Sequence, residues 1–420
     1  MVTIKVQARV FISEVCGRSV WAAQVLAILL ALPLIAAPSA RAQTFTVLHK
    51  FTGHAGGTQP PAGVVVDARG NLYGVTEFGG SFNFGTVFKL DPNGRETVLH
   101  SFLGGDGVSP AEPLIWGAHG TLYGTTLEGG SSEGGKCKHG CGAVFAADKT
   151  GKETVLYAFT GGADGGQPNA TLIRDAAGNF YGTTLGGGSS AGNCQYQSCG
   201  VVFKLDKAGK ETVLHTFTGG SDGAFPNGLI RDGAGNLYGT TYSGGTSGQG
   251  TVFELDKTSG KFTVLYGFAG KTDGGGPSGG LVRDGAGDLY GTTGYGGDLN
   301  CQAPYGCGTV FKMDKTGTET VLYSFAGFND GTYPTTLISD RAGNFYGTTL
   351  SGGTEGSGSV FKLDASGSHT VLHSFRGSDG KSPNALIMDG AGNLYGTTSE
   401  GGDYSCSKGY GCGVVFKLTP

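Results

Sequence analysis

Eight of the nine cysteines form four close pairs along the chain, and the ninth, Cys16, lies in the N-terminal segment. The pairs are Cys137/Cys141, Cys194/Cys199, Cys301/Cys307 and Cys406/Cys412. An even number of cysteines in closely spaced pairs is typical of disulfides in an oxidising compartment. A metal site is the alternative, because His139 lies inside the first pair, but the other three pairs enclose no histidine. We therefore expect four disulfides, no metal site and no cofactor.

An aspartate recurs in the motif Asp-Gly-x-x-Pro, and its carboxylate has two possible roles. The residues are Asp106, Asp164, Asp222, Asp273, Asp330 and Asp379. They could bind a cation such as calcium, or each could stabilise the turn at its glycine. Calcium needs several oxygens at one point, whereas each motif supplies a single carboxylate. The turn is the favoured interpretation, and the aspartates remain candidate ligand-binding residues.

Aromatic residues are scattered through Gly-rich segments that differ from repeat to repeat. The candidates for ligand contact are Phe82, Phe84, Tyr196, Tyr242, Tyr295, Tyr305, Tyr404 and Tyr410. Exposed aromatic rings in polar loops suit a sugar ring or a peptide side chain. Packing of these rings over the loops themselves is the alternative.

The sequence contains no His-Glu-x-x-His or P-loop motif. Histidines share one repeat position with tyrosines, and we expect them far apart around the molecule: His49, His100, His215 and His373, with Tyr157, Tyr266 and Tyr323. A hydrolase or lyase acting on polysaccharide is the alternative function, and it would need paired carboxylates. Acids that could supply them are Glu77, Glu112, Glu128, Glu133, Glu355 and Glu400.

The elements that must position these residues are repeats of Gly-Asn-Leu-Tyr-Gly-Thr-Thr and its near copies. The copies are Gly70–Thr76, Gly120–Thr126, Gly178–Thr184, Gly235–Thr241, Gly287–Thr293, Gly343–Thr349 and Gly392–Thr398. Each lies in a unit of four short runs rich in β-branched and aromatic residues, separated by Asp-x-x-Gly turns. Four strands per unit, at a spacing of 49 to 58 residues, favour a propeller blade over a solenoid coil.

The two ends of the repeat region complement each other. Residues 45–51 read as a fourth strand without its first three, and residues 413–418 as a third strand without its fourth. Their pairing would complete the last blade and leave no free sheet edge. We therefore expect an all-β, seven-bladed β-propeller with four antiparallel strands per blade, closed by the N-terminal strand.

The first 42 residues differ in composition from the rest. Three basic residues precede an apolar run over residues 20–37, and Ala40-Arg41-Ala42 follows. This pattern predicts a signal peptide cleaved near Ala42, which leaves residues 43–420 as the propeller domain, secreted or periplasmic. An uncleaved anchor is the alternative, which Pro33 within the run disfavours.

Charge limits the class of partner. The signal segment holds four of the 29 Lys and Arg residues and one of the 33 Asp and Glu residues, so residues 43–420 carry a net charge of −7. Without a basic patch, nucleic acid is an unfavoured partner. We expect no membrane span in the mature chain, and a monomer.

The tandem pattern resembles the Gloeo/Verruco (GloVer) tandem-repeat family of exported bacterial proteins. The resemblance rests on the heptapeptide followed by Gly-Gly, Gly-Thr-Val-Phe-Lys-Leu-Asp and Thr-Val-Leu-His-Ser-Phe, and it covers Phe45 to Leu418. It implies a secreted, propeller-like protein. The family transfers no catalytic residue.

Loop length indicates which face of such a propeller carries function. First-to-second and third-to-fourth connections share one face and are short and uniform, whereas second-to-third loops and interblade links share the other. The second face holds every cysteine pair and most of the length variation, as binding loops on a rigid scaffold do. We expect a non-catalytic module that binds a glycan or protein there.

Overall fold

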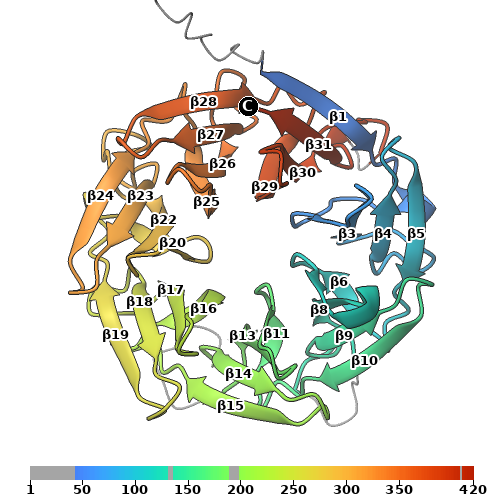
Figure 1. Ribbon diagram of the computed structural model, residues 1–420, viewed down its shortest axis with the longest axis horizontal. Coiled ribbons are helices and arrows are strands. Elements are labelled where there is room, and N and C mark those ends of the chain that lie inside the picture. The colour runs from blue at the N-terminus through green and yellow to red at the C-terminus, as the bar shows by residue number, and fades with distance from the viewer. Residues whose placement is uncertain (1–42, 131–135, 189–197, 407–408) are drawn as a thin grey trace, which may run out of the picture. The chain divides into compact units, whose positions relative to one another are not determined.

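The short apolar runs form the strands of seven antiparallel sheets, arranged around a ring as a seven-bladed β-propeller (Figure 1). This computed structural model describes residues 43–130, 136–188, 198–406 and 409–420. The predicted signal peptide, Cys194, Tyr196 and Glu133 lie outside the described residues. The all-β fold and its blade number confirm the sequence prediction.

Strand positions within the blades are the same around the ring. The heptapeptide forms the second strand of each blade, from blade 1 to blade 7: β3 (Leu72–Thr76), β8 (Leu122–Glu128), β13 (Phe180–Gly186), β17 (Leu237–Ser243), β22 (Leu289–Tyr295), β26 (Phe345–Ser351) and β30 (Leu394–Glu400). The third strands are β4 (Thr86–Leu90), β9 (Ala143–Ala147), β14 (Val201–Leu205), β18 (Thr251–Leu255), β23 (Thr309–Met313), β27 (Ser359–Leu363) and β31 (Val414–Thr419). The fourth, outermost strands are β5 (Glu96–Ser101), β10 (Glu153–Ala158), β15 (Glu211–Thr216), β19 (Phe262–Gly267), β24 (Glu319–Ser324), β28 (His369–Ser374) and, for blade 7, β1 (Thr44–Lys50).

The innermost strands depart from the expected pattern. In blades 4, 6 and 7 the Asp-Gly-x-x-Pro link continues into one bulged strand: β16 (Ala224–Arg231), β25 (Thr332–Ser339) and β29 (Lys381–Met388). In blades 2, 3 and 5 one more residue follows the proline, and the strand divides into β6 (Val108–Pro110) with β7 (Ile115–Trp116), β11 (Gly166–Pro168) with β12 (Ile173–Arg174), and β20 (Gly275–Pro277) with β21 (Val282–Arg283). Blade 1 has β2 (Val65–Val66). The end of the link is thus strand rather than loop.

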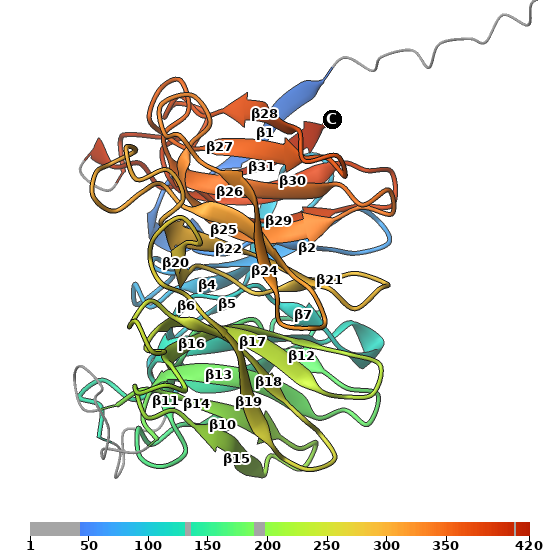
Figure 2. The ribbon, with the colours of Figure 1, turned by 90° about the vertical axis from the view of Figure 1, so that its left-hand side faces the viewer.

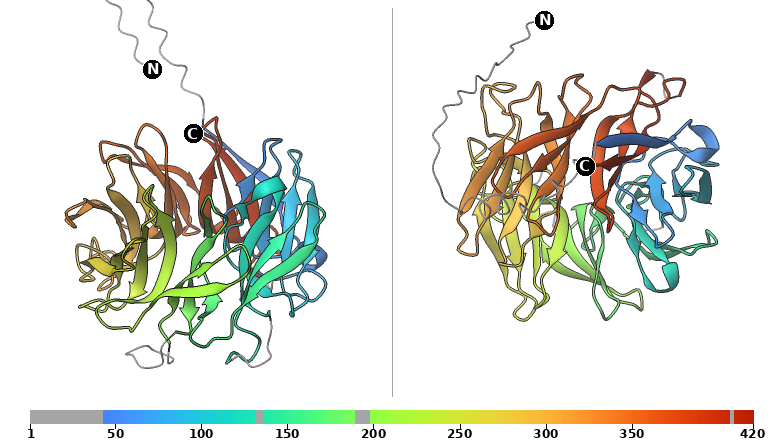
Figure 3. Two further views of the ribbon diagram at one scale, coloured as in Figure 1. Left: turned by 60° about the horizontal axis from the view of Figure 1, so that its bottom comes forward. Right: turned by 45° about the horizontal axis from the view of Figure 1, so that its top comes forward.

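The N-terminal strand closes the ring. β1 pairs antiparallel with β31, from Thr44 opposite Thr419 to Lys50 opposite Val414. Figure 3 shows the blue first strand beside the red last blade. Closure leaves blade 7 with four strands, like blades 1, 4 and 6.

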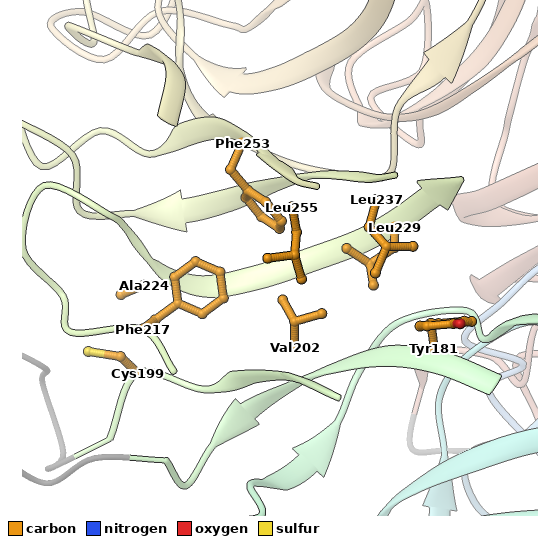
Figure 4. Close-up of a cluster of buried hydrophobic side chains, with 9 residues drawn as sticks. All are labelled: Tyr181, Cys199, Val202, Phe217, Ala224, Leu229, Leu237, Phe253 and Leu255. Carbon is orange, nitrogen blue, oxygen red and sulfur yellow. The ribbon is translucent and has the colours of Figure 1, made fainter. Parts of the chain in front are cut away.

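Phenylalanine pairs fill the junctions between blades. At each junction a phenylalanine after the fourth strand meets one in the third strand of the next blade, edge to face; between blades 3 and 4, Phe217 meets Phe253 with ring centroids 5.5 Å apart (Figure 4). Both rings are fully buried. Edge-to-face packing places the positive ring edge on the negative ring face. These pairs are the core of the propeller.

Figure 2 shows the ring from its side, with the second-to-third loops and the interblade links on one face and the hairpins on the other. Two single helical turns lie among the described residues, η1 (His54–Gly56) in the first interblade link and η2 (Ala118–Gly120) in a hairpin of blade 2. No helix of the described residues is long and apolar enough to span a membrane.

Candidate ligand-binding site

Disulfide bonds constrain the second-to-third loops, as predicted from the sequence. Bonds join Cys137 to Cys141, Cys301 to Cys307 and Cys406 to Cys412. The second cysteine of each pair is buried beside the blade core. These bonds therefore tie each variable loop to the rigid part of its blade.

The predicted pair Cys194/Cys199 falls only partly within the described residues. Cys199 is disulfide-bonded and fully buried, and it packs in the core cluster that also contains Val202 and Phe217 (Figure 4). Cys199 therefore has the same buried place in blade 3 that the second cysteine has in the other three pairs. Because Cys194 lies outside the described residues, its pairing with Cys199 stays a prediction.

The link aspartates are held within their own turns. Asp106 accepts the Leu103 N–H at 2.7 Å, and its other oxygen lies 2.9 Å from His100 Nε2. Asp330 accepts the Ala326 N–H at 2.9 Å and the Tyr323 hydroxyl at 2.7 Å. The same two contacts, to a backbone N–H and a fourth-strand ring, occur at Asp164, Asp222, Asp273 and Asp379. They fit the turn interpretation, and a part in ligand binding stays a prediction.

Most of the predicted aromatic residues lie apart from one another. Phe82, Tyr242, Tyr305, Tyr404 and Tyr410 are exposed, on blades 1, 4, 5 and 7. Phe84 and Tyr295 are half-buried, and the Phe84 ring stacks at 6.5 Å from that of Phe82. The structure brings Tyr242 and Tyr295 together.

A row of tyrosines crosses blades 4, 5 and 6 on the variable face. The hydroxyl of Tyr242, at the end of β17, hydrogen-bonds that of Tyr295, at the end of β22. The Tyr295 ring packs edge to face against Tyr333 at 5.9 Å, and the Tyr333 hydroxyl donates to Gln302 Oε1 at 2.7 Å. Burial, followed by the hydrogen bond that the Tyr242 hydroxyl shares with Tyr295, raises the pKa of Tyr242. We call these four residues the tyrosine row.

A glycine makes room for the tyrosine row. The residue before the link proline has a positive φ in all blades, and elsewhere it carries a side chain: Gln59, Ser109, Gln167, Phe225, Tyr333 and Ser382. In blade 5 it is Gly276, with φ 57°. A Cβ there would lie 2.8 Å from the Tyr295 ring and 3.3 Å from that of Tyr242. Blade 5 therefore differs from the other six blades at this position, where the missing side chain leaves room for the two rings.

A pocket of about 720 Å³ lies beside the row, between the loops of blades 5 and 6. Gln302 lines it, so the pocket and the tyrosine row share a residue. Phe328, which is 90% exposed, supplies an apolar ring, and Asn300, Thr354 and Glu355 supply amide, hydroxyl and carboxyl groups. Such a mixture can hold both an apolar face and hydroxyl groups of one ligand.

Sequence reasoning missed Tyr333, Gln302 and Phe328. Tyr333 and Phe328 lie in the interblade link, where only the aspartate was considered, and Gln302 lies between two paired cysteines. Tyr333 could have been found, because aligned repeats place it at a link position whose residue type varies from blade to blade.

The central channel offers a single acid. A cavity of about 440 Å³ is lined by the inner strands of the blades, and Glu112 is the one ionisable side chain among its described lining residues. Burial raises the pKa of Glu112 to about 8, and the hydroxyl of Thr171 lies 3.4 Å from its carboxylate. The two-carboxylate mechanism needs a second acid, which this lining does not supply.

The remaining acids have other surroundings. Glu400 pairs with Lys381 at 2.6 Å, Glu128 ends β8, and Glu355 is exposed in the pocket. Burial raises the pKa of Glu77, at the end of β3.

Solved structures similar to this chain include one with a TM-score above 0.5, which supports the fold. Among solved structures, the extracellular domain of a protein assigned as a one-component system from B. thetaiotaomicron has a TM-score of 0.54 and 13% identity, over 90% of this chain and 42% of that one. A luciferin-regenerating enzyme has a TM-score of 0.46 and 14% identity, over 90% and 95% of the two chains. A gluconolactonase from Xanthomonas campestris has a TM-score of 0.41 and 15% identity, over 72% and 83%. No curated protein matched the chain.

Family comparison extends over the whole propeller. The model of the Gloeobacter/Verrucomicrobia repeat matches residues 37–193, 132–303 and 299–420. These overlapping matches cover the seven copies of the heptapeptide. The chain therefore belongs to the Gloeobacter/Verrucomicrobia repeat family.

Proposed function

We propose that this protein is an exported, non-catalytic binding module whose tyrosine row and adjoining pocket hold a glycan. The main support for this proposal is Gly276. The other blades have a side chain at this link position, but in blade 5 a side chain would collide with the rings of Tyr295 and Tyr242. Seven near-equal blades need no such exception for folding. The exception therefore points to a site that uses blades 4 to 6.

The chemistry of the site favours a sugar. An exposed aromatic ring can cover the apolar face of a pyranose, while amide and carboxyl groups bind its hydroxyls. Phe328 and Tyr242 offer rings, and Gln302, Asn300 and Glu355 offer polar groups. Export through the signal peptide, with cleavage near Ala42, and action as a monomer in the periplasm or outside the cell belong to the same proposal. The three disulfides with both cysteines described fit an oxidising compartment.

A glycan array with purified residues 43–420 tests this function. We expect binding to a defined group of glycans, and a loss of at least about tenfold in affinity for the double variant Tyr295→Ala/Tyr333→Ala. Tyr404→Ala on blade 7 is the matched control and should bind as wild type. Equal binding by the double variant would refute the site. Binding to a peptide array alone would indicate a protein ligand in place of a glycan. Release of new reducing ends from a polysaccharide would favour the alternative function, a hydrolase or lyase.

A further inference from the structure

The outer edge of the junction between blades 1 and 2 gathers three groups that can bind a metal. His100 comes from β5, Asp106 from the following link and Glu153 from the start of β10. One ligand atom from each lies within 4.8 Å of the others. His100 Nε2 and Asp106 Oδ2 are 2.9 Å apart, and both side chains are 16% exposed. The group is sheltered but open to the solvent.

This combination differs from the six equivalent junctions. At two of them a fourth-strand histidine stacks on a phenylalanine: His215 on Phe262 at 3.7 Å and His373 on Phe45 at 3.6 Å. At two others a tyrosine replaces the histidine, with Tyr157 facing Glu211 and Tyr266 facing Glu319.

Each of the last two junctions also lacks a member of the group: one has no glutamate, and the other has no link aspartate. Tyr323 stacks on His369 at 4.2 Å, with no glutamate at that position. His49 lies 3.3 Å from Glu96, but the link aspartate is absent there. Among the described residues, histidine, aspartate and glutamate therefore come together only between blades 1 and 2.

One oxygen of this group has no partner. Oε1 of Glu153 is buried and forms no hydrogen bond with the described residues. The Glu153 carboxylate lies near that of Asp106, with one ligand atom of each within 4.8 Å of the other. Two carboxylates held so close share the site more easily when a proton or a cation lies between them. Glu96, Glu211 and Glu319 have the same unpartnered oxygen at their junctions, but among the described residues only Glu153 has both a histidine and an aspartate beside it.

We propose that His100, Asp106 and Glu153 form a binding site for a divalent transition-metal ion of the zinc type. The ligands would be His100 Nε2, one oxygen of Asp106 and Oε1 of Glu153, with water completing the coordination. Zinc accepts this mixture of imidazole and carboxylate at about 2.0–2.2 Å. Calcium prefers six to eight oxygens, so one imidazole and two carboxylates suit it poorly.

The spacing between His100 and Asp106 is close to that geometry, whereas the Glu153 ligand atom lies within 4.8 Å of theirs. Two ligands bound at about 2.1 Å lie roughly 3 Å apart around a metal, as His100 Nε2 and Asp106 Oδ2 already do. Binding would replace the proton that lies between these two atoms. The ion would join β5, the link and β10, and so clamp two blades together.

Zinc titration of metal-free, fully oxidised residues 43–420 tests the proposal. Isothermal titration calorimetry should show one tight site per chain and a rise in melting temperature with zinc. His100→Tyr recreates the Tyr-Asp-Glu junction that the chain already folds at Tyr157 and Tyr266, and Glu153→Gln keeps the side-chain shape. We expect either variant to bind zinc at least about 10-fold more weakly, because loss of a ligand removes a metal bond.

His215→Tyr, at a junction without glutamate, is the control and should bind like wild type. Two results would overturn the proposal: no tight site in the wild type, or His100→Tyr and Glu153→Gln binding zinc as strongly as the wild type. Melting curves of the metal-free variants establish that each one is folded.

Discussion

Phe45 lies flat against His373, with ring centroids 3.6 Å apart and ring planes inclined by 3°. The two residues belong to opposite ends of the described chain, on β1 of blade 7 and β28 of blade 6. The same stack occurs inside the chain between Phe262 and His215. Ring closure therefore uses the contact of an ordinary blade junction.

Ring closure can be tested at this stack. Phe45→Ala and Phe262→Ala each remove one ring from a half-buried stack, and each should lower the free energy of unfolding by about 2 kcal/mol. Deletion of residues 43–50 removes a whole strand and should lower the melting temperature far more than Phe45→Ala does. Urea unfolding and calorimetry measure both. A deletion variant that melts like the wild type would show that β1 does not close the ring.

The glycine in the middle of the heptapeptide serves close packing. At Gly239 a Cβ would lie 2.6 Å from the Phe253 ring and 2.9 Å from Leu229. Gly239→Ala should therefore destabilise the protein by about 1–3 kcal/mol, as overpacking does. Gly285→Ala, at a site with nothing within 4 Å, is the control and should change stability little. Phe253→Leu should partly rescue Gly239→Ala, and equal losses at Gly239 and Gly285 would refute this role.

Two buried glutamates should make stability depend on pH. Burial first, and then Asp164 and Asp273 respectively, raises the pKa of Glu211 and Glu319 to about 7. Because these pKa values exceed that of an unfolded glutamate, the stabilisation is complete below about pH 4.3 and is lost as the pH rises through 7. Glu211→Gln/Glu319→Gln should thus match the wild type at pH 4 and exceed it at pH 8 by on the order of 1 kcal/mol per site. Chemical unfolding across this range measures the difference, and parallel profiles would contradict the assignment.

The disulfides should stabilise loops more than the ring. They close segments with sequence separations of only 4 and 6 residues, and short closed loops restrict the unfolded chain least. Denatured, unreduced protein should show no free thiol with Ellman's reagent, which also tests the predicted bond between Cys194 and Cys199. After reduction we expect the far-ultraviolet circular dichroism to stay unchanged while glycan binding weakens. Eight free thiols before reduction would contradict the pairing.

The fold was readable from the sequence because each blade repeats the same local signals. The heptapeptide gives the second strand, and Asp-x-x-Gly gives the hairpins, as at Asp232, which accepts the Asn236 N–H at 2.8 Å. The split inner strands were missed, because a single extra residue between Pro110 and Leu114 carries no periodic signal. Bulges and breaks depend on how the strand meets its neighbours, which the sequence of one blade does not contain.

The candidate site was predicted only in part. Loop variation indicated the face on which the candidate site lies, and Tyr242 and Tyr295 were among the predicted residues. Their partner Tyr333 comes from a different blade and a different element, so the contact depends on blade-to-blade distance. The meeting of His100 with Glu153 was missed for the same reason.

Hydroxyl-radical footprinting with a glycan identified on the array tests the central claim most directly. Mass spectrometry can compare the oxidation of each tyrosine with and without the ligand. The account predicts protection of Tyr242, Tyr295 and Tyr333, with Tyr404 and Tyr410 on blade 7 unchanged. Protection confined to blade 7, or to the hairpins of the opposite face, would contradict it.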